Sequence, residues 1–300
     1  MGKDALVTVV TPTYNRCGHL KKLYESLESQ MSKDFIWLIV DDGSVDDTRS
    51  VINDIKQDSS FPIEYIYKTN GGKHTALNLA IDKVFTELFF IVDSDDIVTS
   101  DAIQTICNDW NSYRSKNLCG ISYLRGYDEA HPIGDVFPKN YLIDSFTNVR
   151  VRHHVMGDKA EVWATRYLKR FRFPVFKGER FLVESWMWLQ VSDLAAMLFV
   201  NKVIYVTEYL QGGLTQSGRK LRIKNPRGGM TFNLLLMDRR YPMKDRIKST
   251  LLYTCYFFFS RQPLRKTLNN GHLALTLVCL LPGYLLYRYW KFKYLGDDRV

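Results

Sequence analysis

The chain has 300 residues, of which 46% are hydrophobic and 24% are charged, and its formal net charge at pH 7 is +9. Such a composition excludes a disordered chain, and the length suffices for one large α/β domain with an appendage. Five cysteines, an odd number without a C-x-x-C pair, argue against a disulfide framework and favour reduced thiols in the cytoplasm, and no secretory signal is recognised.

The first third of the chain alternates between predicted strands and helices. Residues 7–15 predict a buried strand that Pro12 ends in a turn, because β-branched residues dominate it and proline cannot donate to a strand ladder. Leucines at helical spacing predict a helix over residues 17–29. The same plan repeats with strands at 35–40, 63–67 and 88–92 and with helices at about 46–56 and up to about residue 84. Strict alternation predicts an α/β fold with an open, mostly parallel sheet flanked by helices.

A polar cluster follows each of the four predicted strands, at residues 11–15, 41–44, 70–74 and 93–96. In open parallel sheets, ligands bind beyond the carboxyl ends of the strands. The four clusters are therefore expected to line one crevice.

The acidic cluster after the fourth strand has the chemistry of a cation site. Side chains alternate along a strand, so Asp93 and Asp95 are expected to point the same way, with Asp96 turning into the next loop. Hard cations such as Mg²⁺ or Mn²⁺ prefer oxygen ligands, and Mg²⁺ combines one or two carboxylates with substrate phosphates, which implies a nucleotide. The alternative is a solvated acidic turn before the next helix, which begins near Ser100 or Asp101.

Taken together, the four clusters resemble the inverting glycosyltransferases of family 2, which have the GT-A fold. The resemblance covers about residues 5–110 and continues more weakly through residues 177–188 and 208–215, where it is similar to the branch that builds bacterial capsular and exopolysaccharide repeat units. The matching segments are Val-Thr-Pro-Thr-Tyr-Asn15, Val-Asp-Asp-Gly-Ser44 with Asp47 and Thr48, Asn70-x-Gly72 through Asn78, and Asp93-Ser-Asp-Asp96. The fold that this resemblance implies is a Rossmann-like GT-A sheet.

The resemblance assigns most of these residues to the donor, which is expected to be a UDP-sugar. Asp41 or Asp42 would bond the uracil or the ribose, although aspartate beside glycine is also ordinary turn chemistry. Lys73 can meet a phosphate by its charge and through the backbone N–H groups of the helix start, unless it is simply solvated. The resemblance further implies Thr11, Pro12 and Tyr14 as a wall of the nucleotide pocket, Asp93 and Asp95 as donor contacts, and Asp93, Asp95 and Asp96 as ligands of Mn²⁺ or Mg²⁺.

An inverting transfer is a single displacement at the anomeric carbon. A general base must take the proton of the acceptor hydroxyl, while the metal neutralises the leaving diphosphate. By resemblance the base is an acid that opens the helix after the acceptor-side loop. Glu184 fits that place best and Glu179 is the second choice; the alternative is that one of them caps a helix or pairs with an arginine. No histidine lies between His154 and His272, so no third protein ligand for the metal is identified.

Three further groups have both a functional and a structural interpretation. The cluster around His153 and His154 can bind a sugar or belong to the ordinary surface. Trp186 and Trp188 can stack on a sugar ring or fill the core around a buried helix. The basic, glycine-containing segment 221–229 can form a lid over the diphosphate or an exposed loop.

The basic charge is confined to the C-terminal region. Residues 219–300 contain 17 Lys and Arg against 4 Asp and Glu, or +13, whereas the preceding 218 residues carry 24 against 28, or −4. Two apolar segments, 251–259 and 273–287, lie between basic clusters, which fits anionic lipid better than nucleic acid. The second segment has 15 residues and is expected to be broken at Pro282-Gly283, so a monotopic hairpin or an interfacial helix pair is expected rather than a span. The alternative is a helical subdomain packed on the core.

The sequence thus predicts a metal-dependent inverting glycosyltransferase, peripheral or monotopic on the inner face of the cell membrane. It would move a hexose or N-acetylhexosamine from a UDP-sugar to a saccharide on a polyprenyl diphosphate. Residues 1–110 would form the nucleotide-sugar half, residues 111–218 the acceptor half, and residues 219–300 the membrane-associating appendage. One alternative is a sugar-nucleotide-forming nucleotidyltransferase, although the Gly-rich loop that such enzymes normally have after the first strand is missing. The other is a membrane-tethered, glycan-binding scaffold protein.

Overall fold

The structure, a computed structural model, describes residues 5–207 and 214–296 of the chain. The chain divides into two compact units. The first comprises Met1–Arg172 and Met187–Glu208, and the second comprises Phe173–Trp186 and Tyr209–Val300. The segment Phe173–Trp186, expected in the acceptor half of the catalytic domain, therefore groups with the C-terminal region.

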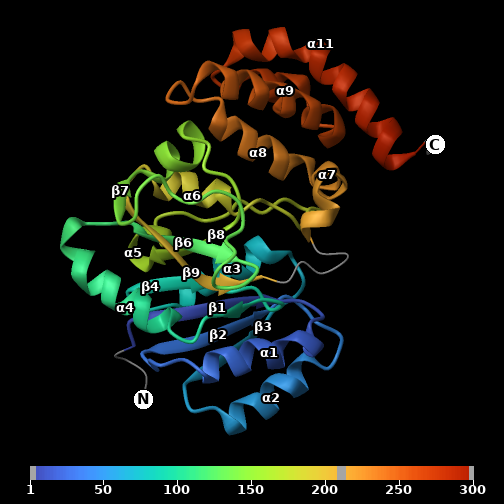
Figure 1. The fold of residues 1–300 in the computed structure, drawn as a ribbon. Helices are drawn as coiled ribbons and strands as arrows, with labels where there is room; N and C mark the ends of the chain where they lie inside the picture. Colours follow the sequence, from blue (N-terminus) through green and yellow to red (C-terminus); the bar gives the residue numbers. More distant parts are fainter. Residues whose placement is uncertain (1–4, 208–213, 297–300) are drawn as a thin grey trace. The chain divides into compact units, whose positions relative to one another are not determined.

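The first unit is built on one sheet, which has nine strands within the described residues and confirms the predicted α/β fold (Figure 1). Strands β1 to β4 are parallel, in the order β3-β2-β1-β4, and the sheet continues as β8-β6-β9-β5, with β7 paired to β9. The antiparallel strand β8 separates β4 from β6, so the sheet is mixed beyond its parallel half. The strands are β1 (Val7–Thr13), β2 (Phe35–Asp41), β3 (Ile63–Tyr67), β4 (Leu88–Ile91), β5 (Ile97–Val98), β6 (Gly120–Gly126), β7 (Leu142–Asp144), β8 (Lys159–Ala164) and β9 (Met197–Val206).

The helices of the parallel half lie where the sequence predicts them. The buried face of α1 consists of Leu20, Leu23 and Leu27, the spacing of one helix face. α1 and α2 pack against each other, and α3 packs on β1 and β2. The helices are α1 (Cys17–Glu28), α2 (Thr48–Asp58), α3 (Lys73–Lys83), α4 (Ala102–Tyr113), α5 (Thr165–Leu168) and α6 (Ser185–Val191), the last of which begins in the second unit.

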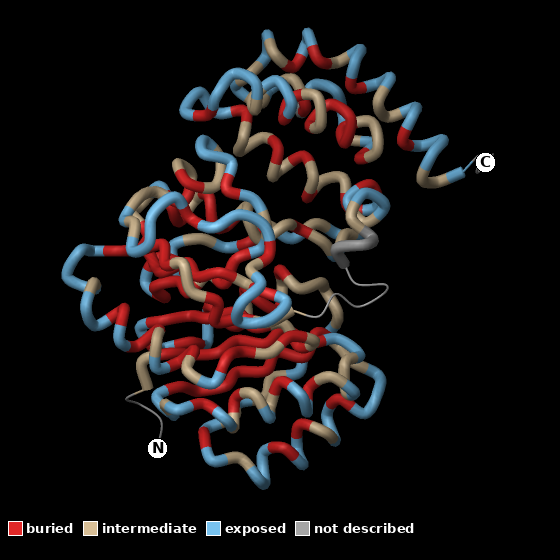
Figure 2. The backbone as a smooth tube through the Cα atoms, viewed as in Figure 1, coloured by how far each residue is buried: buried red, intermediate tan, exposed pale blue. Residues whose placement is uncertain are grey.

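The central strands are buried along their whole length, as the red strands of Figure 2 show. A strand that is covered on both faces carries a continuous apolar run instead of an alternating pattern, and β2 is such a run up to its last residue. Pro12 does not end β1, contrary to the prediction, because it pairs with Val40 and the strand continues to Thr13. Pairing of β1 with β4 stops at Val10, so the missing N–H of Pro12 interrupts no ladder on that side.

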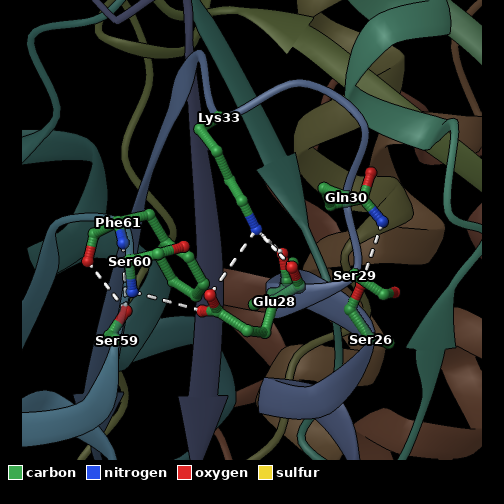
Figure 3. Close-up of polar contacts among 9 residues, drawn as sticks. Ser26, Glu28, Ser29, Gln30, Lys33, Ser59, Ser60 and Phe61 are labelled. Carbon is green, nitrogen blue, oxygen red and sulfur yellow. Dashed lines mark hydrogen bonds and ion pairs between the residues drawn. The ribbon is translucent and has the colours of Figure 1, made fainter.

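A polar cluster joins the amino ends of β2 and β3 to the end of α1 (Figure 3). Lys33, just before β2, donates to the backbone carbonyl of Glu28 and lies 3.9 Å from its carboxylate. The other carboxylate oxygen of Glu28 accepts from the N–H of Ser60, just before β3, at 3.3 Å. These contacts hold α1 at the sheet edge opposite the strand carboxyl ends, where the polar clusters of the predicted crevice lie.

The second unit is helical and has its own apolar core. α9 (Met243–Ser260) packs against both α8 (Pro226–Leu236) and α11 (Leu273–Trp290), while α7 (Leu214–Lys224) and α10 (Leu264–Leu268) complete the described helices. The largest buried side chains of this core are Tyr253, Tyr256, Phe257 and Trp290, and Met230 and Met237 pack with them.

α11 is longer than the sequence predicts. The expected break at Pro282-Gly283 is wrong, because Pro282 lies inside the helix, which continues through a π-helical turn to Leu295. Close packing supports this stretch, since a Cβ at Gly283 would lie only 2.1 Å from the hydroxyl oxygen of Thr254 in α9. In the part of the chain that the structure describes, Leu273–Leu295 is the one helix long and apolar enough to cross a membrane. Of its most apolar 18-residue stretch, 22% is buried.

The basic segment 221–229 is not a loop, so the predicted lid is wrong. It comprises the end of α7 and the start of α8, with Asn225 between them. Pro226 occupies the first position of α8, where its fixed φ and missing N–H suit a helix start. The weak resemblance at residues 208–215 falls mainly on residues 208–213, which lie outside the described residues.

Candidate functional site

The polar clusters that follow β1 to β4 lie at one edge of the sheet and contact one another. The backbone N–H of Asn15 donates to the hydroxyl of Ser44 at 2.9 Å, which joins the first cluster to the second. The carboxylate of Asp42 accepts from the N–H of Gly72 at 2.6 Å, which joins the second to the third. The third and fourth clusters are joined by the ion pair between Lys73 and Asp93. The convergence that the topology predicts is therefore present.

The acidic cluster leaves the strand direction after β4. The N–H of Asp96 donates to the carbonyl of Asp93 at 3.1 Å and closes a turn. As a result Asp93 and Asp96 share a partner: the hydroxyl of Tyr205 accepts from the Asp93 N–H at 2.9 Å and donates to Asp96 at 2.7 Å. Asp95 lies 3.9 Å from the Arg16 guanidinium. β4 ends at Ile91, before the acids, so the strand alternation from which Asp93 and Asp95 are expected to point the same way does not extend to them.

Two cations face this cluster. Lys73, the first residue of α3, places its Nζ 2.5 Å from an Asp93 oxygen. Arg125 in β6 lies 3.7 Å from an Asp96 oxygen and 4.0 Å from Asp93, with its guanidinium carbon 3.9 Å from the centroid of the Tyr205 ring. The negative charge of the cluster is thus balanced largely by the protein itself.

The two paired carboxyls titrate differently. Burial raises the pKa of Asp96 to about 7, with a further contribution from the charge of Asp93, and the Tyr205 hydrogen bond and Arg125 oppose this rise. Burial also acts to raise the pKa of Asp93, but the charges of Lys73 and Arg125 outweigh it and hold that pKa below its ordinary value. At neutral pH Asp93 is ionised, while Asp96 is divided between both forms.

Within the described residues, no group of three or more His, Cys, Asp and Glu side chains is arranged to hold a metal ion. The predicted set of three carboxylates is therefore not brought together. An all-oxygen cluster still suits Mn²⁺ or Mg²⁺ when one or two carboxylates are completed by ligand phosphates. The side chains of Asp93 and Asp95 are 27% and 25% exposed, whereas that of Asp96 is 6% exposed, so the first two are the accessible oxygen donors.

The aspartates after β2 are engaged in the turn. Asp41 accepts from the N–H of Ser44 and from the hydroxyl of Tyr65, both at 2.8 Å. Asp42 accepts from Lys68 at 2.5 Å as well as from the glycine amides of the third cluster. The turn chemistry that the sequence left open is therefore present at both positions. A carboxylate has about four lone-pair sites, so Asp41, with two hydrogen bonds, has more unused sites than Asp42, with three, but both residues are buried.

Of the three residues in the predicted pocket wall, Tyr14 is exposed, at 46%, and the other two are buried. The hydroxyl of Thr11 accepts from the indole N–H of Trp37 at 2.9 Å. Tyr14 is thus the member of the wall whose side chain can meet a ligand, while Thr11 and Pro12 shape the backbone beneath it.

Sequence reasoning missed Arg125 and Tyr205. A charged residue near the end of an otherwise apolar run, Gly-Ile-Ser-Tyr-Leu-Arg125, is a signal that could have located the arginine. No such signal marks Tyr205, since a tyrosine in a buried strand is ordinary.

The predicted base and its competitor lie in the second unit, on Phe173–Trp186. Glu184 is half-buried and directly precedes α6, the predicted place for the base. Glu179 instead accepts from the N–H groups of Arg227 and Gly228, both at 2.9 Å, at the start of α8. This is the helix-capping alternative, and it argues against Glu179 as the base.

The tryptophan and histidine candidates differ in whether a ligand can reach their side chains. Trp188 is buried and stacks on Trp163, with ring centroids 4.8 Å apart, so it belongs to the core and is no platform for a sugar. Trp186 is half-buried, and His153 and His154 are exposed.

The sequence profile described as glycosyl transferase family 2 matches residues 8–171, more than half of the chain. The chain belongs to this family. Membership in glycosyl transferase family 2 confirms the predicted class of enzyme and argues against the nucleotidyltransferase and scaffold alternatives.

Two bacterial relatives illustrate the range within the family. The GalNAc(5)-diNAcBac-PP-undecaprenol beta-1,3-glucosyltransferase of Campylobacter jejuni is 32% identical over 96% of this chain and 97% of that protein. The glycosyltransferase GlyA of Streptococcus pneumoniae is 23% identical over 90% of this chain and 39% of the relative. The chain spans only 39%, 24% and 21% of the length of several such relatives.

Two solved structures show the same architecture. S. aureus TarS 1-349 in complex with UDP has a TM-score of 0.62 at 15% identity, covering 97% of this chain and 92% of that chain. The mannosyltransferase PcManGT from Pyrobaculum calidifontis, in complex with GDP-Man and Mn²⁺, has a TM-score of 0.57 at 17% identity, covering 98% and 88%. Identities this low establish the fold alone, and the predicted GT-A architecture is confirmed.

Proposed function

We propose that this family 2 glycosyltransferase moves a hexose or N-acetylhexosamine, with inversion, from a UDP-sugar to a saccharide on a polyprenyl diphosphate. The reaction uses Mn²⁺ or Mg²⁺ and serves capsule or exopolysaccharide synthesis at the inner face of the cell membrane. The observation that carries this proposal is the convergence of four strand-end clusters on accessible carboxylates that face Lys73.

The donor end of the site has groups for a nucleoside diphosphate. α3 begins at Lys73, so the helix dipole and the lysine charge both favour a phosphate there. Tyr14 is exposed for contact with the nucleoside, and Asp41, although buried, has lone-pair sites left for the uracil or ribose once it becomes accessible. The UDP bound by TarS supports a uridine nucleotide as the donor.

A divalent cation would be held by Asp93 and Asp95, with Asp96 behind them. When bound, such a cation supplies charge neutralisation of the leaving diphosphate, so that no protein acid is required. The protein's own part is to orient the carboxylates: Lys73 and Arg125 keep Asp93 ionised, and the Tyr205 hydroxyl fixes the turn that carries both acids. The Mn²⁺ bound by PcManGT supports a metal of this class.

Glu184 is the proposed general base, which takes the proton of the acceptor hydroxyl as the new glycosidic bond forms and the bond to the diphosphate breaks. Its place directly before α6 supports this role. The lipid-linked acceptor is supported by the Campylobacter jejuni relative, whose name contains PP-undecaprenol and which aligns over nearly the whole of both chains.

α11 supports a place at the membrane surface. The outer face of α11 and of the π-helical turn that extends it carries apolar side chains that are between 51% and 76% exposed, and Arg288, Lys291 and Lys293 lie near the C-terminal end of this face. The opposite face is engaged with α9, where Thr254 donates to the Cys279 carbonyl at 3.0 Å. One apolar face and one packed face favour a helix lying in the interface over a free span. The exposed apolar residues are Leu273, Leu277, Val278, Leu281, Leu285 and Phe292.

Calorimetric titration with UDP, with and without Mn²⁺, tests the donor site. Asp95→Asn is expected to weaken Mn²⁺-dependent UDP binding by roughly 10- to 100-fold, whereas Asp54→Asn on the exposed side of α2 leaves it unchanged. Glu184→Gln is expected to keep UDP binding and to lower transfer by about 10²- to 10⁴-fold. UDP binding that ignores both Mn²⁺ and Asp95 would remove the metal site from the proposal, and normal transfer by Glu184→Gln would remove the base.

A further inference from the structure

The segment Phe173–Trp186, which carries Glu184, has little regular structure of its own before α6 begins. Its position must therefore come from what it contacts. Within the second unit, the N–H of Arg180 donates to the Asn225 side chain at 2.7 Å, and Asn225 in turn donates to the carbonyl of Leu221 at 2.8 Å. Asn225 is buried and separates α7 from α8, so one side chain ties the segment to the joint between two helices.

Glu179 completes the start of α8. Pro226, the first residue of that helix, has no N–H, and the next two amides, of Arg227 and Gly228, donate to the two carboxylate oxygens of Glu179 at 2.9 Å each. The following amide, of Gly229, is satisfied by the Asn225 carbonyl at 3.2 Å. Every backbone donor of the first turn is thus accounted for, and two of them depend on a carboxylate from outside the helix. The negative charge also suits the helix dipole.

The apolar side of the segment is less tightly fixed. Phe181, Leu182 and Val183 border a cavity of about 50 Å³, together with residues of α8 and α9 such as Phe232 and Tyr256. At Gly228, which also borders the cavity, an added Cβ would lie 2.6 Å from the Phe181 carbonyl oxygen, so the two backbones approach closely there. A cavity provides no packing contacts that would hold the segment in place. The hydrogen bonds of Glu179 and Asn225, here called the polar clamp, and the close approach of Phe181 to Gly228 therefore set the position of the segment.

We propose that Glu179 is a positioning residue that clamps the Glu184-bearing segment to α8. The place of the base is then set by the same helical unit that carries α11. This inference rests on the proposed function, in which Glu184 is the general base, and it gives Glu179 a role in transfer without contact with the reacting atoms.

The proposal separates acceptor-side from donor-side effects. The donor clusters belong to the first unit and Glu179 to the second. Loss of the clamp should therefore leave UDP affinity within about twofold of wild type while it lowers kcat by roughly 10- to 100-fold, the cost of a misplaced catalytic group. Glu179→Gln keeps one acceptor oxygen for one of the two amides, so its loss should be smaller than that of Glu179→Ala.

The test combines hydrogen exchange, UDP titration and turnover on the full chain. Glu179→Ala is expected to speed amide exchange at residues 180–186 and 227–228 and nowhere in the first unit. Turnover is followed as UDP release from UDP-glucose with GalNAc(5)-diNAcBac-PP-undecaprenol as the probe acceptor. The acid limb of the kcat pH profile, which reports the base, should move in Glu179→Ala. Asp245→Asn is the matched control, because Asp245 is an acid at the start of another second-unit helix, α9, and belongs to that helix itself.

Several outcomes would overturn the proposal. Unchanged exchange at residues 180–186 in Glu179→Ala would show that the clamp does not fix the segment, and raised exchange with wild-type turnover would show that its position is not needed. Abolished turnover in Glu179→Gln with unchanged exchange would make Glu179 itself the base. If wild type shows neither turnover with the probe nor Mn²⁺-dependent UDP binding, the proposed function fails, while the exchange data still decide the clamp.

Discussion

The hydroxyl of Tyr205 has two partners in the acidic cluster, and the residue is completely buried. Bulk water cannot replace the hydroxyl as the partner of the Asp93 amide or the Asp96 carboxyl unless the structure around Tyr205 opens. A buried polar group that loses its partner costs about 1–3 kcal/mol. The tyrosine is therefore expected to stabilise the native turn, whatever it contributes to ligand binding.

Tyr205→Phe is expected to lower the free energy of unfolding by about 1–3 kcal/mol, because it removes the hydroxyl and leaves the ring in place. Urea unfolding followed by fluorescence measures the change. Tyr67→Phe on β3 serves as the control, since Tyr67 is 56% exposed and should change stability little. Equal stability of Tyr205→Phe and wild type would mean that Asp96 finds another donor.

Lys159 is a second buried polar residue, only 2% exposed, whose ammonium donates to the carbonyls of Ile133 and Met156 at 3.1 and 3.0 Å. Burial, together with the charge of Arg150, lowers its pKa from 10.5 to about 8. The folded protein therefore releases this proton at lower pH than the unfolded chain. Below pH 8 both states hold the proton and the full cost of burying the charge applies; between pH 8 and 10.5 that cost is relieved.

The free energy of unfolding of wild type is accordingly expected to rise relative to Lys159→Met by up to about 3 kcal/mol between pH 8 and 10.5. Urea unfolding of both proteins across this range measures the difference, in which titrations common to the two proteins cancel. A difference that stays constant with pH would contradict the lowered pKa.

At the scale of elements, the parallel half of the fold could be predicted and the mixed half could not. β1 and β2 are covered on both faces and so carry long apolar runs, and α1 shows its leucine face directly. β8, by contrast, pairs with Leu88 and Gly120, far away in the sequence, and no local pattern specifies such partners. α11 runs through Pro282 because its packing on α9 overrides local propensity.

Some positions of the site could likewise be predicted from the sequence, and others could not. Positions set by strand ends, such as Asp41 and Lys73, could be located from the sequence because parallel strands deliver their carboxyl ends to one edge. The partnership of Asp93 with Asp96 could not, since it depends on a turn and on Tyr205, which arrives from β9. The sequence leaves open whether Glu179 is a general base or a helix cap. The position of the α8 amides, which donate to it, favours the cap.

The close approach of α9 and α11 gives a test at this scale. Gly283→Ala would place a Cβ 2.1 Å from the Thr254 hydroxyl oxygen, and overpacking of this kind costs about 1–3 kcal/mol. Gly218→Ala is the matched control, a glycine in α7 whose added Cβ meets nothing within 4 Å and which should gain up to about 1 kcal/mol from helix propensity. Thermal unfolding midpoints that shift equally in both variants would show that the helices do not meet at Gly283.

At the scale of the whole molecule, the charge asymmetry and the outer face of α11 belong to the same region. Residues 219–300 carry a net charge of +13, and the apolar side chains of α11 lie among those cations. Hydrophobic insertion and attraction to anionic lipid would therefore act together.

Leu281→Glu combined with Leu285→Glu is expected to weaken binding to vesicles that contain anionic lipid by about 100-fold or more, because burial of each leucine contributes roughly 1.5–3 kcal/mol. Co-sedimentation measures binding, and UDP titration checks that the donor site is intact. The control is Val45→Glu, a substitution of an apolar residue that is 86% exposed in the first unit. Wild-type binding by the double variant would exclude this face, and resistance of the wild type to alkaline carbonate extraction would indicate a span.

The second unit is discontinuous in sequence, since it takes Phe173–Trp186 and then everything from Tyr209 onward. A chimera that exchanges this unit between two family members therefore needs three junctions, near residues 172, 186 and 208. A single junction near 208 would pair Glu179 of one parent with the α8 of the other, and the amides at the start of that helix would keep a carboxylate only by coincidence. To transfer the second unit from one protein to another, two separate stretches of the gene must therefore be moved together.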